Sequence, residues 1–316
     1  MENFLFSINA VAPTFIIAFT GFMLKQRGFL TEPFLKNLDK YCFTIAFPAL
    51  MIRDIGDADI STMWSAEYVL ICFIATTFLF FGYYLIFYPF FKDKWFVSSF
   101  VQCCARGSVA VFGASIAINI YGNAGVTPLM MAIVVPLYNI YTVILFNLKS
   151  DNGGKIFSAQ NLKKMGKGII TNPLIIGIII GAIVSFGDFT IPTVVYKPLS
   201  SIASTGTPMA LLSLGAGLQL DKIKGNIKVI LASNFFKLVG NFALILPFAI
   251  MLGLRDGHLV ALLIMAASPC TVTAYIMANA MGGDGEFSCG SVMMSTLLST
   301  VTITFWLTVL KSFALI

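Results

Sequence analysis

Charged residues are scarce in this 316-residue sequence: aspartate and glutamate number 14, lysine and arginine number 20, and together they form 11% of the chain. A soluble globular protein carries roughly 25% charged residues, and a single soluble core stops growing near about 250–300 residues. Because 58% of the residues are hydrophobic, too little charge remains to cover a surface that faces water. The composition excludes a soluble enzyme, a nucleic-acid-binding protein and a disordered regulator, and it indicates an integral membrane protein.

Residues that build metal centres and hydrolytic sites are few as well. The sequence has one histidine, His258, and six cysteines without Cys-x-x-Cys spacing, and it contains no P-loop motif. A metal centre needs clustered ligands, and a hydrolase needs a nucleophile beside a base. We therefore expect no cofactor, no metal site and no enzymatic activity, and we interpret the cysteines as buried free thiols.

Ten apolar runs are each about long enough for a helix to cross the hydrocarbon region of a membrane, which takes about 20 residues. The runs are continuously apolar rather than alternating, which favours helices over the strands of a membrane β-barrel. We expect an all-α integral membrane protein with ten transmembrane helices. The expected spans are 5–24, 35–52, 66–91, 95–121, 126–148, 169–187, 196–218, 227–252, 258–282 and 286–311.

Lysine and arginine in the short loops between these spans predict the orientation. Fourteen of them fall on one side of the membrane and four on the other, and the side with more is expected to be cytoplasmic. This places both termini outside the cytoplasmic membrane of the cell and the polar linker 149–168 inside. We therefore interpret the net charge of +6 as basic residues that set the orientation in the membrane, and not as a surface for nucleic acid. The two remaining basic residues, Arg106 and Lys237, lie within spans.

The linker 149–168 divides the spans into two sets of five, 1–148 and 169–316. An odd number of spans per half gives the halves opposite orientations, which is the inverted repeat of many secondary transporters. The halves align without a gap at an offset of 160, and helix breakers then recur at equivalent places, as Gly122 and Gly282 do.

Spans 4 and 9 each contain a candidate helix break, Arg106-Gly-Ser and Ser268-Pro-Cys-Thr, and the offset aligns Ser108 with Ser268. Unwound backbone inside a membrane survives where it lines a cavity or is buried in protein, so paired breaks indicate a transport site. Half-helix N-termini and an arginine at such a site would attract a carboxylate. The alternative is a simple kink at Pro269, with Arg106 reaching the interface or neutralising an acid. The candidate substrate-binding residues are Arg106, Gly107, Ser108, Pro269, Cys270 and Thr271.

Three further features have two interpretations each. Pro48 and Pro208 form a second matched pair, which either kinks helices around a cavity or reflects irregular packing. Lys237 either neutralises the substrate and changes protonation or extends to the inner interface. Asn139 either donates its amide to the substrate or forms an interhelical hydrogen bond.

In the order and spacing of its motifs, the chain resembles the bacterial branch of the auxin efflux carrier family over essentially its whole length. It departs from the family at Ser108, where asparagine is common, and at Ala274, where plant members have a second proline. The matching motifs are Phe47-Pro-Ala-Leu, Arg106-Gly-Ser, Ile120-Tyr-Gly, Pro136-Leu-Tyr-Asn, Asn172-Pro-Leu-Ile, Pro208-Met-Ala-Leu-Leu-Ser-Leu-Gly-Ala and Ala267-Ser-Pro.

The resemblance implies ten helices, with the broken spans 4 and 9 crossing at the middle of the membrane. It implies a scaffold of spans 1, 2, 6 and 7 beside a transport domain, an elevator-type motion and a homodimer. The bacterial relatives are linked to malate, malonate or lactate and the plant members to auxin. Carried over by position, the crossing corresponds to Gly107, Ser108 and Pro269-Cys-Thr, and a polar contact corresponds to Asn139.

The function that these observations favour is a secondary carrier of small organic anions, such as carboxylates, across the cytoplasmic membrane by alternating access. No aspartate or glutamate is obvious within the spans, so uniport, exchange, proton coupling and sodium coupling all stay open. One alternative is a sodium-coupled symporter of the bile-acid type, which shares the ten-helix inverted repeat. Another is a receptor or sensor that binds a ligand in the same pocket without transporting it. The expected partners are the organic anion and the lipid bilayer.

Overall fold

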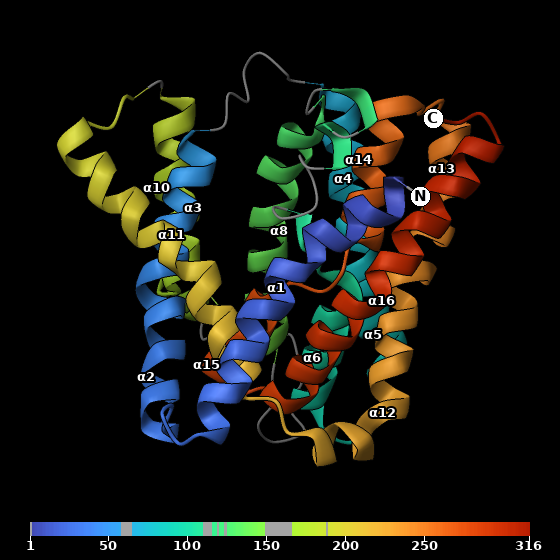
Figure 1. Cartoon of the computed structure of the whole chain (residues 1–316). Coiled ribbons are helices and arrows are strands. Elements are labelled where there is room, and N and C mark those ends of the chain that lie inside the picture. The colour runs from blue at the N-terminus through green and yellow to red at the C-terminus, as the bar shows by residue number, and fades with distance from the viewer. Residues whose placement is uncertain are drawn as a thin grey trace.

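The computed structural model describes residues 2–57, 65–109, 116–118, 120–122, 125–148, 166–187 and 189–316. These residues form helices and no strand (Figure 1), and helical backbone occurs within each of the ten ranges predicted to span the membrane. Most of the linker, 149–165, lies outside the described residues, so the division of the chain into 1–148 and 169–316 stays a prediction.

The helices of the first half follow the predicted ranges closely, with short π-helical turns inside two of them. A run of apolar residues supports each helix, and π-helical turns inside α-helices are often found at functional sites. The helices are α1 (Glu2–Gln26), α2 (Glu32–Tyr41), η1 (Cys42–Ala46), α3 (Phe47–Gly56), α4 (Ala66–Thr77), η2 (Phe78–Gly82), α5 (Tyr83–Phe87), α6 (Lys94–Ala105) and α8 (Thr127–Asn147).

The second half repeats this pattern, and its π-helical turn η3 begins within two residues of the place that the offset of 160 assigns to η2. Side-chain caps fix several helix starts; Asn172, for example, accepts a hydrogen bond from the backbone N–H of Leu174 at 2.9 Å. The helices are α10 (Pro173–Phe186), α11 (Thr193–Ala216), α12 (Leu220–Phe235), η3 (Phe236–Gly240), α13 (Asn241–Met251), α14 (Asp256–Ala267), α15 (Val272–Met281) and α16 (Gly285–Ser312).

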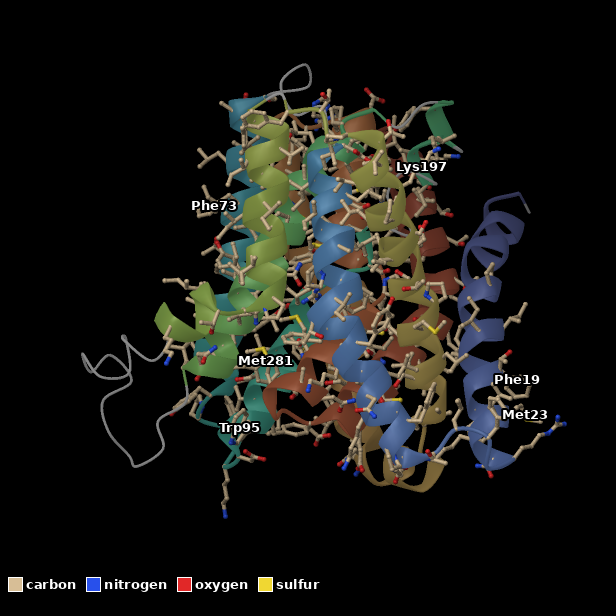
Figure 2. The ribbon with its side chains drawn as sticks, turned by 90° about the vertical axis from the view of Figure 1, so that its left-hand side faces the viewer. Phe19, Met23, Phe73, Trp95, Lys197 and Met281 are labelled. Atoms are coloured by element: carbon tan, nitrogen blue, oxygen red, sulfur yellow. The ribbon has the colours of Figure 1, made fainter. Side chains whose placement is uncertain are left out.

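Several of these helices can cross a membrane by length and composition. Among the described residues, four continuous helical stretches meet both requirements, and the pair α14 and α15 forms a fifth that is bent by 40°. Large apolar side chains also point outward at the periphery, as Figure 2 shows for Phe19 and Phe73, which are 61% and 44% exposed. The chain is therefore a multi-pass membrane protein, whereas ten crossings stay a prediction. The four stretches are Ala66–Phe87, Thr127–Asn147, Gly225–Met251 and Gly285–Ser312.

Helix packing has a matching pattern in the two halves. α1 packs closely on α11, and α10 packs closely on α3; in the same way α4 packs on α8, and α12 on α16. Small residues allow this proximity: a Cβ added at Gly21 would lie 2.0 Å from the Leu212 carbonyl oxygen, and one at Gly181 would lie 2.9 Å from that of Met51. If each helix is replaced by the one five spans further along or back, the α1–α11 contact becomes the α10–α3 contact, and the α4–α8 contact becomes the α12–α16 contact.

One helix in each half is followed by a glycine with the same backbone conformation. Gly122 and Gly282, which the offset of 160 aligns, have φ values of +74° and +76°. This left-handed conformation is common at helix C-termini and strains most residues with a side chain, so it favours glycine at both places.

The helices form two groups, with α2, α3, α10 and α11 on the left of Figure 1 and α4, α5, α12, α13, α14 and α16 on the right. α1 packs on α11 and also touches α16, and α15 touches α11. The broken helices therefore lie where the two groups face each other.

Candidate functional site

The two predicted helix breaks meet in the structure. Residues 106–108 interrupt the helix after α6, and residues 268–271 separate α14 from α15. The backbone N–H of Ser108 donates a 2.8 Å hydrogen bond to the carbonyl oxygen of Pro269, so each extended segment satisfies a polar group of the other. The structure thus brings together the residues Arg106, Gly107, Ser108, Pro269, Cys270 and Thr271.

The crossing is tightly packed at Gly107. A Cβ at this position would lie 2.5 Å from Ser268 Oγ, 3.0 Å from the carbonyl oxygen of Met265 and 3.1 Å from Lys237 Nζ. No real Cβ approaches another heavy atom at 2.5 Å, so only glycine fits without a shift of its neighbours.

A cavity of about 470 Å³ lies on one side of the crossing. Its walls come from both breaks and from α3, α8, α11 and α16, and more than half of the lining residues are apolar. It is therefore formed between the two helix groups and not within either one. The lining residues with polar side chains are Asp54, Asp57, Arg106, Ser108, Tyr138, Thr207, Cys270, Thr271, Thr273 and Thr296.

Arg106 lines this cavity although its side chain is almost entirely buried, with 3% exposure. Its Nη2 donates to Asn139 Oδ1 at 2.8 Å, and its Nη1 contacts Met277 Sδ at 3.0 Å and Thr142 Oγ1 at 3.5 Å. The Nε atom is buried and has no hydrogen-bond partner among the described residues. All of these neighbours are neutral, so they orient the guanidinium without compensating its charge.

No carboxylate pairs with Arg106 in the described part of the chain. The ion pairs found there join Lys25 to Glu32 and Arg53 to Asp54. A charged side chain within a membrane is costly and usually functional. Neither half of the alternative interpretation of Arg106 fits this geometry, since the side chain neither reaches the surface nor contacts an acid among the described residues.

The N-terminal end of α15 adds to the positive character of the cavity. Thr271, Val272 and Thr273 at this end all line it. The first N–H groups of a helix have no partner within the helix, and they give its N-terminus a partial positive charge. The cavity therefore combines a buried guanidinium with a helix N-terminus, and both favour an anion.

Asn139 contacts Arg106 and does not line the cavity. Its Nδ2 donates to the Val135 carbonyl oxygen at 2.9 Å within α8 and lies 3.6 Å from Met51 Sδ. The geometry thus resembles the interhelical hydrogen bond of the second interpretation, with Arg106 as the partner.

Lys237 lies on η3, does not line the cavity and is 0% exposed. Its Nζ donates to the carbonyl oxygens of Ala266, Met265 and Ala105 at 2.8, 3.3 and 3.4 Å. The side chain therefore neither extends to the interface nor lines the cavity.

Pro48 and Pro208 lie beside the cavity without breaking their helices. Pro48 is the second residue of α3, which follows the π-helical turn η1, and Pro208 lies inside the continuous helix α11. Their neighbours Leu50 and Thr207 line the cavity. A Cβ at Gly177 would lie 2.7 Å from the Pro48 carbonyl oxygen, so Pro48 lies at the close contact between α3 and α10.

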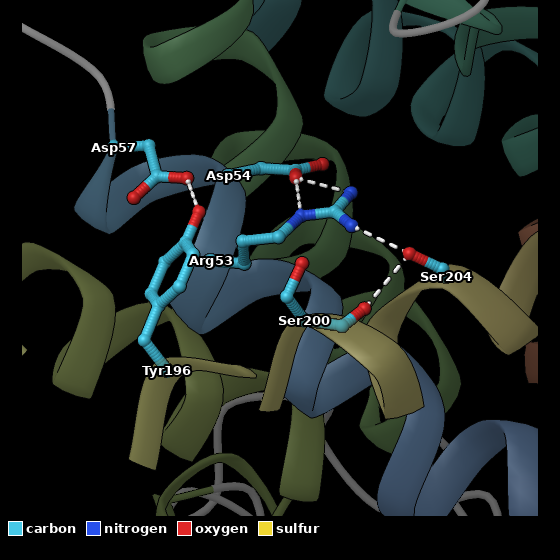
Figure 3. Close-up of polar contacts among 6 residues, drawn as sticks. All are labelled: Arg53, Asp54, Asp57, Tyr196, Ser200 and Ser204. Atoms are coloured by element: carbon cyan, nitrogen blue, oxygen red, sulfur yellow. Dashed lines mark hydrogen bonds and ion pairs between the residues drawn. The ribbon is translucent and has the colours of Figure 1, made fainter. Parts of the chain in front are cut away.

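Two acidic residues of the cavity wall were missed by the sequence analysis. Asp54 accepts from Arg53 Nη2 at 2.8 Å, and Asp57 accepts from the hydroxyl of Tyr196 at 2.6 Å, joining α3 to α11 (Figure 3). Asp54 was overlooked because the predicted span ended at residue 52, whereas α3 continues to Gly56. A third aspartate, Asp39, lies within the predicted span 35–52 and accepts from Asn279 Nδ2 at 2.8 Å.

The remaining candidates for chemistry form no site in the described residues. All six cysteines are buried and free, and no three histidine, cysteine, aspartate or glutamate side chains of the described chain are grouped for a metal ion.

Comparison with known proteins agrees with this arrangement. A family model described as "Membrane transport protein" matches residues 6–307. An uncharacterized transporter of Methanocaldococcus jannaschii is 22% identical over 306 residues, which cover 95% of this chain and 97% of the relative. A protein of Rhizobium meliloti that is provisionally named a malonate transporter is 22% identical over 311 residues, covering 96% of each chain. The chain belongs to the membrane transport protein family, which is the auxin efflux carrier family that its motifs resemble.

Proposed function

We propose that this protein is a secondary carrier that moves small organic anions, in particular carboxylates, across the cytoplasmic membrane by alternating access. The observation that carries the proposal is Arg106, a buried arginine among the residues that line a cavity of about 470 Å³, with no carboxylate partner among the described residues. Removing a charge from water costs several kcal/mol or more unless another charge or a set of hydrogen bonds compensates it. A carboxylate substrate supplies that compensation.

Arg106 is also suited to a carboxylate in its geometry. A guanidinium binds a carboxylate through two parallel N–H donors, and Nε of Arg106 has no other partner. Asn139 Oδ1 accepts from Nη2, which has two N–H groups, and this contact orients the guanidinium.

The rest of the cavity restricts the class of anion. Most lining side chains are apolar, and the acidic residues Asp54 and Asp57 belong to the same wall. Asp54 is paired with Arg53, whereas Asp57 accepts a hydrogen bond from the hydroxyl of Tyr196 and has no ion-pair partner among the described residues. The substrate we propose is therefore a compact anion whose carboxylate binds Arg106. Malonate, which the name of one relative mentions, is a suitable first probe.

The transport mechanism that we propose is the elevator-type motion of an inverted repeat with ten spans and both termini outside. Support comes from the matching packing of α1 on α11 and of α10 on α3, and from the position of the cavity between the two helix groups. Sliding of one group along the other would open such a cavity to each side in turn. The homodimer implied by the family stays a prediction.

The test is uptake of radiolabelled malonate, malate and lactate into liposomes that contain the purified protein. We expect Arg106→Gln to reduce uptake at least 100-fold, because loss of one charge-assisted bidentate contact to a buried anion costs about 3 kcal/mol or more. Arg27→Gln is the matched control, since it makes the same substitution at an exposed arginine.

Two results would contradict the proposal, and a third would favour an alternative carrier. Uptake by Arg106→Gln at the rate of the original protein would remove the anion site from Arg106. Saturable binding of an anion by a correctly inserted protein without any flux would favour the receptor or sensor. Uptake that requires sodium would favour the bile-acid-type symporter.

A further inference from the structure

Lys237 binds the ends of two helices at once. Its three oxygen partners belong to Ala105, the last residue of α6, and to Met265 and Ala266 in the last turn of α14. An ammonium group has three N–H donors and no acceptor, so the three carbonyl oxygens satisfy it completely.

These helix ends need a positive charge. The last carbonyl groups of a helix have no partner within the helix, and they give its C-terminus about half a negative elementary charge. Two such ends together carry about one negative charge, which a single ammonium balances.

Neutral side chains also donate hydrogen bonds to the carbonyl oxygens of these two helix ends. Asn241 Nδ2 donates to the carbonyl oxygens of Cys104 and Ala266 at 2.8 and 3.2 Å, and the Tyr138 hydroxyl donates to that of Met265 at 2.9 Å. Lys237 is thus the group that supplies the charge, and no carboxylate of the described chain pairs with it.

In transporters with broken helices, half-helix C-termini and unwound carbonyls are the groups that coordinate a monovalent coupling cation. We propose that the Lys237 ammonium occupies such a cation site as a tethered cation. The protein then needs no sodium at the crossing, and removal of the side chain creates a site for a free monovalent cation. The statement about sodium-independent transport rests on the proposed function, whereas the cation site does not.

The site can be tested by thermal unfolding of the purified protein at constant ionic strength. Lys237→Ala deletes the atoms of a propylammonium ion, so propylammonium chloride is the matching probe, with sodium chloride as the inorganic probe and choline chloride as the bulky reference. We expect Lys237→Ala to unfold at a lower temperature in choline and to gain about 3 °C or more, saturably, in propylammonium or sodium.

Controls separate this effect from a general influence of salt. The original protein and Lys197→Ala, at an exposed lysine on the upper surface in Figure 2, should show equal unfolding temperatures in all three salts. Should Lys237→Ala fail to fold, Lys237→Met keeps most of the apolar stem and leaves space for ammonium or sodium ions, which should then raise its unfolding temperature.

The absence of any cation-specific gain in both variants would overturn the proposal, and so would a sodium-specific gain in the original protein. Because unfolding measures no transport, these outcomes are independent of the Arg106→Gln uptake experiment.

Discussion

The guanidinium of Arg106 and the ammonium of Lys237 both lie at the crossing, but they have different kinds of partner. Arg106 lines the cavity, and its hydrogen-bond partners among the described residues are neutral, the nearest being Asn139 at 2.8 Å and Met277 at 3.0 Å. Lys237 faces helix carbonyls that carry partial negative charge. At the scale of single residues, one cation is therefore available to a ligand and the other is already used by the protein.

This difference predicts the effect of a new acid beside Arg106. Asn139→Asp would place a carboxylate oxygen 2.8 Å from Nη2, where the amide oxygen now lies. The resulting ion pair should compensate the guanidinium and compete with the substrate, so we expect uptake to fall at least tenfold while the unfolding temperature stays the same or rises. Uptake and thermal unfolding measured on the same preparation check this.

Asn147→Asp is the matched control, because Asn147 lies on the same helix. Its Nδ2 donates to the Val143 carbonyl oxygen, just as Asn139 Nδ2 donates to the Val135 carbonyl oxygen. An equal loss of uptake in both variants would show that Arg106 does not need its neutral partner.

At the scale of elements, the two interrupted helices separate positive from negative ends. The N-terminus of α15 lines the cavity, while the C-termini of α6 and α14 point to Lys237. The hydrogen bond from Ser108 to Pro269 joins the two breaks, and Gly107 permits the close approach. The breaks therefore act as one unit whose geometry depends on the small size of residue 107.

Gly107→Ala tests this dependence. The added methyl group would lie 2.5 Å from Ser268 Oγ and 3.1 Å from Lys237 Nζ, and overpacking of this kind costs about 1–3 kcal/mol. We expect an unfolding temperature lower by about 2–8 °C and reduced uptake.

Gly257→Ala serves as the comparison, because a Cβ at Gly257 meets no atom within 4 Å. If Gly107→Ala were as stable and as active as Gly257→Ala, the crossing would not be the tight unit described above.

At the scale of the whole molecule, the matched contacts of the two halves favour an inverted repeat. Gly21 brings α1 onto α11, and Gly181 brings α10 onto α3, which are the same contact after a shift of five spans. With the five spans per half that we propose, the halves have opposite orientations, and we expect both termini on one side of the membrane.

Cysteine labelling tests this topology, since all six native cysteines are buried and free and give little background. With a membrane-impermeant maleimide, we expect Ser312→Cys, at an exposed position near the C-terminus, to react in intact cells. Ser158→Cys, in the linker, should react only after the cells are permeabilised. The reverse pattern would place the termini in the cytoplasm.

Local signals predicted much of the site, while partners distant in sequence could not be predicted. Arg106, Ser108 and Pro269 were found because an intramembrane charge and a proline interrupt apolar runs. Asp54 was missed because hydropathy does not show where a helix ends, and neither interpretation of Lys237 named the helix carbonyl groups that it contacts. Its carbonyl partner at Ala105 is 132 residues away, and no pattern in one sequence reports such a contact.

The sequence by itself determined the membrane class, the family and the positions of the two helix breaks. These depend on composition, on motif order and on residues such as Gly107 and Pro269, whose effects on the backbone are local. Only the tertiary structure decided that the two breaks touch, that Arg106 lines a cavity with neutral neighbours and that Lys237 binds the ends of α6 and α14. The reason is that the environment of a buried charge is built by helices far apart in the chain.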